Sequence, residues 1–217
     1  MGSAQHSHAN DGSKKPKRRS QAERTATSDH QMLQAAVSLI ALKGSTDWTL
    51  AEVGRNAGYT GGLVSHRFGS KNGLLLAVTN RIVELFVDKI LGQSAQTQKP
   101  ARRLISFFEV YAHQLQEGSD LFIAFHRLMA DSHTTLPQLR PTFEAINVNL
   151  LTAIASALKE GQCDGSIRKN INMEFEAYAF VALFRGLTNL WMTGPRDLNL
   201  DEFVRYECEQ FRRRILV

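Results

Sequence analysis

An all-α fold is the class that this sequence predicts, on three observations. Apolar residues recur at the three- and four-residue spacing of helices along most of the chain. No alternating strand pattern occurs, and capping residues or glycines stand where the helical segments begin and end. We therefore expect an N-terminal three-helix head with a helix-turn-helix, followed by a C-terminal helical bundle. We place a disordered basic tail at residues 1–20, the head at 21–70 and the bundle at 71–217.

Composition is that of an ordinary globular protein. The 217 residues are 43% hydrophobic and 22% charged, and no apolar run approaches the roughly 20 residues that span a bilayer. The N-terminus lacks the apolar core of a signal peptide, so we expect a cytoplasmic protein with no membrane partner. Cys163 and Cys208 are isolated in the sequence, which predicts reduced cysteines that act as small apolar groups.

The positive charge is concentrated at one end of the chain. Residues 1–81 contain 11 Lys and Arg against 5 Asp and Glu, whereas the remainder contains 15 against 16. This asymmetry is expected when one end of a protein meets a polyanion.

Residues 49–71 carry the signals of the helix-turn-helix. Thr49 and Glu52 have the spacing of a capping box, a glycine turn follows, and Thr60 and Ser70 can cap the next two helices. Any αα corner would share these caps. Here, however, the first two helices have only about two turns each, the second is mostly small or polar, and a basic arm precedes them. The second helix is the one that enters a DNA major groove in such motifs.

The other helices follow from their apolar stripes. We expect one from about Ser28 to Lys43, with Trp48 packed under the helix that follows it, and a long helix over about 70–91 that links the head to the bundle. A polar loop should cover 92–100, and 161–171 reads as a turn-rich connection. The bundle helices are expected at about 101–116, 120–132, 137–160, 173–193 and 199–214.

Several of these residues together resemble the N-terminal signature of tetracycline-repressor (TetR) family transcriptional regulators. The resemblance covers about 45 residues and is carried by Ala35-Ala36, Gly44, Thr49 to Val53, Ala57-Gly58, Phe68, Ser70-Lys71 and Leu74. It implies a sequence-specific DNA-binding regulator, most simply a repressor that a small, mainly apolar ligand releases from double-stranded operator DNA. It also implies a homodimer formed through the last two helices, working at the nucleoid.

The resemblance assigns candidate DNA contacts to the head. These are Thr49, Thr60, Gly61, Gly62, Leu63, Ser65, His66, Arg67 and Lys71, with Lys17, Arg18 and Arg19 from the basic arm. Arg67 can grip a guanine or a phosphate, and Lys71 is expected to clamp a phosphate at a helix start. Leu63 can equally belong to the core, and the arm can equally be a solubilising tail. Ser65 stands where the family usually has an aromatic residue.

The aromatic-rich bundle is where the resemblance implies a ligand site. The candidate lining is Phe108, Tyr111, Phe125, His126, Asn147 and Tyr178, although such residues are also ordinary core. The histidines are too loosely spaced for a metal site, and no nucleophile–base or phosphate-loop motif occurs. We therefore expect no cofactor, no metal and no catalysis. The alternatives are a helical small-molecule-binding protein and a helical-bundle enzyme, neither of which would bind DNA.

Overall fold

The computed structural model describes residues 20–88, 92, 99–194 and 197–217. Within them the chain is all-α, as predicted. The helices are α1 (Gln21–Lys43), α2 (Leu50–Ala57), α3 (Gly61–Phe68), α4 (Lys71–Val87), α5 (Pro100–Glu117), α6 (Asp120–Asp131), the short 3₁₀ helix η2 (Pro137–Leu139), α7 (Arg140–Cys163), α8 (Met173–Thr193) and α9 (Leu200–Ile215). No helix in this described part is long and apolar enough to cross a membrane. The predicted tail, with Lys17, Arg18 and Arg19, and most of the predicted 92–100 loop lie outside the described residues.

Side-chain caps fix where the helices of the head begin. The Thr49 hydroxyl accepts from the backbone N–H of Glu52 at 3.2 Å, as the capping box predicts. Thr60 and Ser70 cap α3 and α4 in the same way. The prediction for α1 was wrong, because this helix begins at Gln21 and not at Ser28. A second capping box, between Ser20 and Glu23, starts it.

The end of α7 also differs from its prediction. Gly161 was expected to open a turn, but the helix continues through it to Cys163. Gly161 is buried, and a Cβ there would overlap the side chain of Ile167. The glycine therefore permits close packing, and the left-handed turn falls later, at Gly165 with φ of 79°.

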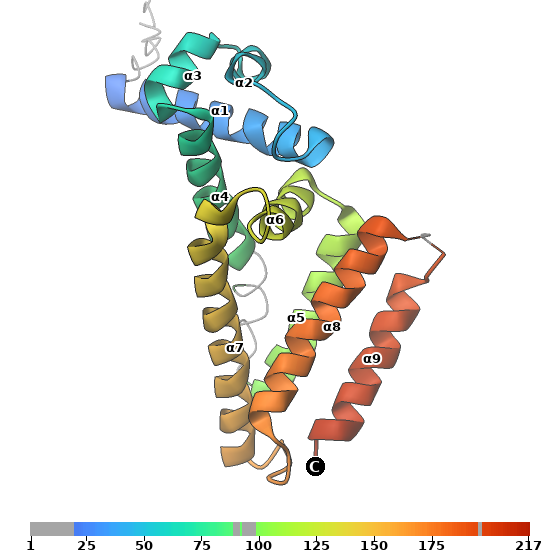
Figure 1. The fold of residues 1–217 in the computed structure, drawn as a ribbon. Coiled ribbons are helices and arrows are strands. Elements are labelled where there is room, and N and C mark those ends of the chain that lie inside the picture. The colour runs from blue at the N-terminus through green and yellow to red at the C-terminus, as the bar shows by residue number, and fades with distance from the viewer. Residues whose placement is uncertain (1–19, 89–91, 93–98, 195–196) are drawn as a thin grey trace, which may run out of the picture.

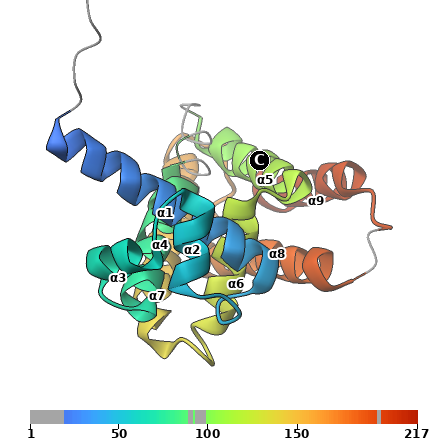
Figure 2. The same ribbon diagram turned by 90° about the horizontal axis from the view of Figure 1, so that it is seen from above.

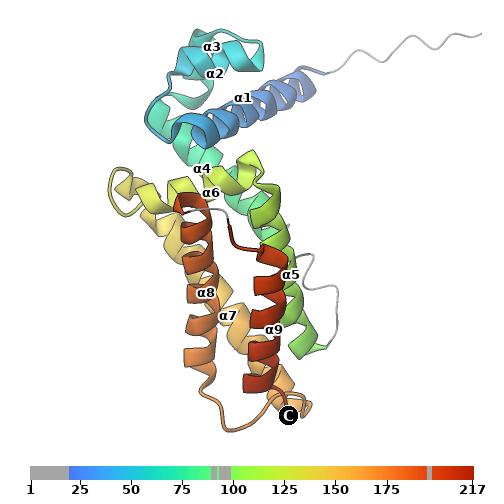
Figure 3. The same cartoon turned by 90° about the vertical axis from the view of Figure 1, so that its right-hand side faces the viewer.

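The head and the body are arranged end to end. Figure 1 shows α1, α2 and α3 at one end, with α4 descending from them towards the bundle. The body consists of α5, α7, α8 and α9, in which α5 packs against the other three. In Figure 3, α8 and α9 lie on the face towards the viewer.

Helix α6 joins the two parts. It lies across the body beneath α1, as Figures 1 and 2 show, and it also packs against α4. Buried residues of α6, among them Phe125 and Leu128, belong to the same apolar core as Met32, Trp48 and Val64 of the head. The head therefore shares its core with the body, which is expected of a unit too small to bury much surface alone.

Candidate nucleic-acid interface and ligand cavity

Two glycines set the close crossing of α2 and α3. A Cβ on Gly54 would lie 2.6 Å from the carbonyl carbon of Thr60, and one on Gly61 would lie 2.8 Å from Cα of Ala51. Between the helices, Gly58 adopts the left-handed conformation with φ of 79°. Gly61, predicted as a DNA contact, therefore has a packing role in the structure.

The other candidate residues of α3 divide between surface and core. The exposed ones are Thr60, Gly62, Ser65, His66 and Arg67. Leu63 is half-buried against the core of the head, which agrees with the core alternative for this residue. An exposed row on a short helix therefore remains as the surface that can meet a duplex.

Arg67 is held against α1. Its Nη2 donates to Thr25 Oγ1 at 3.0 Å, and its Nε lies 3.5 Å from Asp29 Oδ1. The guanidinium is thereby held on α1, while those of its five N–H donors that do not face Thr25 and Asp29 remain available to a base or a phosphate. This interaction could not be predicted from local sequence patterns, because Thr25 and Asp29 lie about 40 residues earlier in the chain.

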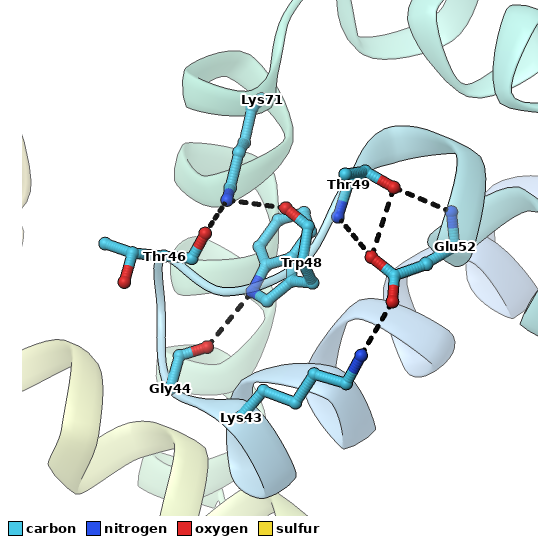
Figure 4. A network of polar contacts seen from close by, with 7 residues as sticks. All are labelled: Lys43, Gly44, Thr46, Trp48, Thr49, Glu52 and Lys71. Carbon is cyan, nitrogen blue, oxygen red and sulfur yellow. Dashed lines mark hydrogen bonds and ion pairs between the residues drawn. The ribbon is translucent and has the colours of Figure 1, made fainter.

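Lys71 points into the loop between α1 and α2 (Figure 4). Its Nζ donates to the carbonyl oxygens of Thr46 at 2.5 Å and Trp48 at 2.7 Å, and lies 4.3 Å from the centre of the Trp48 ring. Partial burial lowers the pKa of Lys71. Because an ammonium group has three N–H donors, this staple leaves one for a phosphate. In the structure Lys71 thus staples this loop, and its role as a phosphate clamp stays a prediction.

Thr49 belongs to a neighbouring polar network, also drawn in Figure 4. Its backbone N–H donates to Glu52 Oε2 at 2.8 Å, and Lys43 Nζ donates to Glu52 Oε1 at 2.6 Å. The hydrogen bond from Lys43, followed by that from the Thr49 backbone, lowers the pKa of Glu52 to about 2. Thr49 therefore serves first to fix the start of α2.

The body contains a cavity of about 250 Å³. Of the six predicted ligand residues, Tyr111, Phe125 and His126 line it, whereas Phe108, Asn147 and Tyr178 do not. Phe108 is buried against Phe180 and Phe184 instead, and Tyr178 is 58% exposed on α8.

Lining residues that the sequence analysis did not assign come from α4, α5, α6, α7 and α8. They are Val83, Phe86, Val87, Phe107, Met129, Thr142, Ala145, Ile146, Asn149, Leu150, Val181, Phe184 and Arg185. Most lie on apolar stripes that sequence reasoning assigns equally well to core. For Phe86, the sequence signal was the apolar stripe of the long helix that links the head to the body, which is α4 in the structure.

Polar groups meet at one side of the cavity. The Tyr111 hydroxyl lies 3.1 Å from His126 Nε2 and 2.8 Å from Thr188 Oγ1. Burial, and secondarily the charge of Arg185, lowers the pKa of His126 to about 3, so its ring is neutral at pH 7. Burial also raises the pKa of Tyr111 and lowers that of Arg185. Arg185 donates to Asn147 Oδ1 in a short hydrogen bond.

An apolar stripe is exposed along the outer side of α8. Phe175 is 69% exposed, Tyr178 58% and Leu190 67%, and Gly186 leaves open space where a Cβ would stand. Ala179 and Ala182, also exposed, complete the stripe at helical spacing. In the described part of the chain, no group of three or more His, Cys, Asp or Glu residues could hold a metal ion.

Comparisons with known proteins agree with this geometry. Residues 32–78 match the family described as bacterial regulatory proteins, tetR family. The HTH-type transcriptional regulator BetI of Brucella anthropi is 27% identical over 127 residues, which are 57% of this chain and 66% of that protein. The chain thus spans just under two thirds of this relative, and about a third of other BetI regulators that it matches.

Solved structures resemble the chain over most of its length. A candidate transcriptional regulator from Saccharomonospora viridis, in complex with choline, superposes with a TM-score of 0.78 at 21% identity, covering 88% of this chain and 99% of the other. AibR, solved with isovaleryl coenzyme A and operator DNA, gives a TM-score of 0.68 at 18% identity, with 84% and 97% covered. At such identities the likeness establishes the shared fold alone.

Proposed function

The chain belongs to the tetR family of bacterial regulatory proteins, and from that premise we propose that it is a transcriptional repressor which a small ligand releases from operator DNA. One observation carries the proposal: a single helix, α6, contributes Phe125 and His126 to the cavity wall and packs against the DNA-binding head. A helix that forms the cavity wall and also supports the head is a physical link through which a bound ligand can change DNA binding. Such a repressor works in the cytoplasm, at the nucleoid.

The DNA-binding surface is the exposed row of α3. Gly62 lets a duplex approach the helix backbone closely, while Ser65 and His66 can donate to phosphates or bases. Arg67 is held by Thr25 and Asp29, and its remaining N–H donors add to this row. Lys17, Arg18 and Arg19 of the N-terminal arm add charge that is suited to phosphates or to the neighbouring minor groove.

A homodimer supplies the second head. The exposed apolar stripe of α8, with small residues at Ala179, Ala182 and Gly186, lets another helix come close. We place the interface on α8 and α9 as a four-helix contact between two chains. Such a dimer would set its heads about 34–36 Å apart, which is the spacing of successive major grooves. Light scattering at micromolar concentration should give twice the chain mass, and a monomer would contradict the interface.

Three polar contacts tie α6 to α1 and to the loop that follows α1, and so transmit the state of the cavity. Ser38 Oγ donates to Asp120 Oδ2 at 2.6 Å, and Ser45 Oγ donates to Asp131 Oδ2 at 2.5 Å. Arg127 Nη1 donates to the carbonyl oxygen of Ile40 at 3.2 Å. A ligand that displaces α6 would therefore move α1, and with it α3, out of register with the DNA.

Selection of bound fragments from random DNA, followed by gel shifts, tests the proposal. We expect the purified protein to prefer a defined sequence, and His66→Ala to weaken that binding. His113→Ala is the matched control, because His113 is an exposed histidine of α5, outside the head. Removal of residues 1–19 should reduce the dependence of affinity on salt. Equal binding to all fragments, including the DNA upstream of its own coding region, would refute the proposal.

A further inference from the structure

Arg185 gives the cavity a positive charge that has no counter-ion among the residues that the structure describes. It reaches the wall from α8, it is only partly exposed, and its hydrogen-bond partner, Asn147, is neutral. No carboxylate lines the cavity among the described residues, and the stretches 89–91 and 93–98 contain no Asp or Glu in their sequence. A charge removed from water without a partner is unfavourable, so the cavity favours a ligand that supplies one.

The neighbouring polar groups do not neutralise this charge. Tyr111 is bound to His126 and Thr188 and keeps its proton, because burial raises its pKa. His126 is neutral for the same reason, as described above. Both groups can donate or accept hydrogen bonds, but neither supplies a negative charge at pH 7. Arg185 is thus the only charged group on the described wall.

The remaining wall is mostly apolar, with four phenylalanine rings and only Thr142 and Asn149 as polar members among the described residues. Phe86 and Phe125 stack in parallel with their centres 3.9 Å apart, and Phe107 and Phe184 meet edge to face at 5.1 Å. A volume of about 250 Å³ lies just below the usual range of small-molecule sites, so the occupant is compact. From this arrangement we propose that the ligand is a compact apolar carboxylate, whose anionic group pairs with Arg185 while its apolar part lies among these rings.

The charge also argues against a cationic ligand such as the choline in the similar Saccharomonospora viridis structure. Aromatic faces attract a quaternary ammonium, but Phe86 and Phe125 cover one another's inner faces by stacking. A cation in the cavity would also lie near the guanidinium of Arg185, and no carboxylate of the described lining would offset the repulsion. This inference rests on the proposed function only in treating the cavity as the effector site.

Calorimetric titration of the full-length protein without DNA tests the ligand class. Octanoate, 1-octanol and octyltrimethylammonium share an eight-carbon chain and differ in charge. We expect octanoate to bind at least tenfold more tightly than octanol, and the ammonium more weakly than both. Arg185→Gln should reduce octanoate affinity at least tenfold and leave octanol affinity unchanged, whereas Arg185→Lys should keep the preference for octanoate. Arg140→Gln, at an exposed arginine of α7, is the matched control and should behave as the wild type.

The outcomes separate the ligand class from the proposed function. No binding of octanoate, equal affinity for the three probes, tighter binding of the ammonium, or an unchanged octanoate affinity in Arg185→Gln would overturn the inference. Gel shifts repeated with the same probes then test regulation independently. Octanoate that binds through Arg185 without releasing DNA would support the ligand class and refute the ligand-released repressor. DNA release by octyltrimethylammonium alone would refute the ligand class and support the ligand-released repressor.

Discussion

Replacing Gly61 with alanine tests whether the α2–α3 crossing depends on close backbone contact. The added Cβ would lie 2.8 Å from Cα of Ala51, which is 0.6 Å short of the 3.4 Å at which ordinary contact begins. Because backbone atoms cannot rotate away, the two helices must separate. Overpacking of this kind costs about 1–3 kcal/mol. Alanine's better helix propensity returns at most about 1 kcal/mol. We therefore expect Gly61→Ala to lower the free energy of unfolding by roughly 1–2 kcal/mol.

Gly62→Ala is the matched control in the same helical turn. A Cβ there meets only Thr60 Oγ1 at 3.9 Å. The higher helix propensity of alanine is therefore not offset by overpacking, and it should raise the free energy of unfolding by up to about 1 kcal/mol. Urea unfolding followed by circular dichroism measures both variants. In thermal melts the Gly61 variant should unfold roughly 2–8 °C below the wild type. If Gly61→Ala proves as stable as Gly62→Ala, the close crossing is not what this glycine permits. We also expect Gly62→Ala to weaken DNA binding despite its stability, because the methyl group would stand between helix and duplex.

Three further predictions concern the polar contacts of the head. Lys71→Met should lower the free energy of unfolding by about 1 kcal/mol, because two loop carbonyls lose their donor. An unchanged urea midpoint would contradict the role of Lys71 as a loop staple. The pKa of Glu52 is depressed to about 2 in the folded chain from an ordinary 4.5, so the stability it contributes is full above pH 4.5 and is lost as the pH falls towards 2. The difference in melting temperature between wild type and Glu52→Gln should therefore shrink over that window, and a constant difference would contradict the assignment. Ser45→Ala and Asp131→Ala each remove one partner of a 2.5 Å hydrogen bond, so their effects on stability should be non-additive by at least about 0.5 kcal/mol in a double-mutant cycle. Strict additivity would show that the contact is absent in solution.

Sequence predicted helix starts well where a side-chain cap and an apolar stripe coincide. Thr49, Thr60 and Ser70 meet both conditions, and the structure confirms all three caps. The first turns of α1 have a cap but no stripe, since residues 21–27 are polar apart from two alanines. For that reason the start of α1 at Gln21 was not predicted. The sequence pattern predicted a turn at Gly161, but this glycine lies within α7. Close contact with the side chain of Ile167 explains why a glycine stands there.

The candidate site was less predictable because its contacts join distant residues. Lys71 and Arg67 have the charge and position of DNA contacts, yet their acceptors in the structure lie 23 to 42 residues away. Phe108 and Tyr111 share one face of α5 by spacing, but only Tyr111 reaches the cavity. That division is set by how α5 is rotated against its neighbours. Arg185 stands in an apolar run of the sequence, which offers no reason to assign this residue to a ligand site.

The position of α6 explains how a small cavity can control a distant surface. Phe125 of α6 stacks on Phe86 of α4, so a ligand between α4 and α6 meets the two helices that connect the body to the head. Allosteric coupling is typically about 1–3 kcal/mol, and each polar contact from α6 to α1 or to the loop after α1 contributes on the order of 1 kcal/mol. Loss of the contact between Ser45 and Asp131 should therefore remove a measurable part of the coupling. A ligand should still bind Ser45→Ala with wild-type affinity and yet shift its DNA affinity less than it shifts that of the wild type, because α6 could then move without carrying α1 with it.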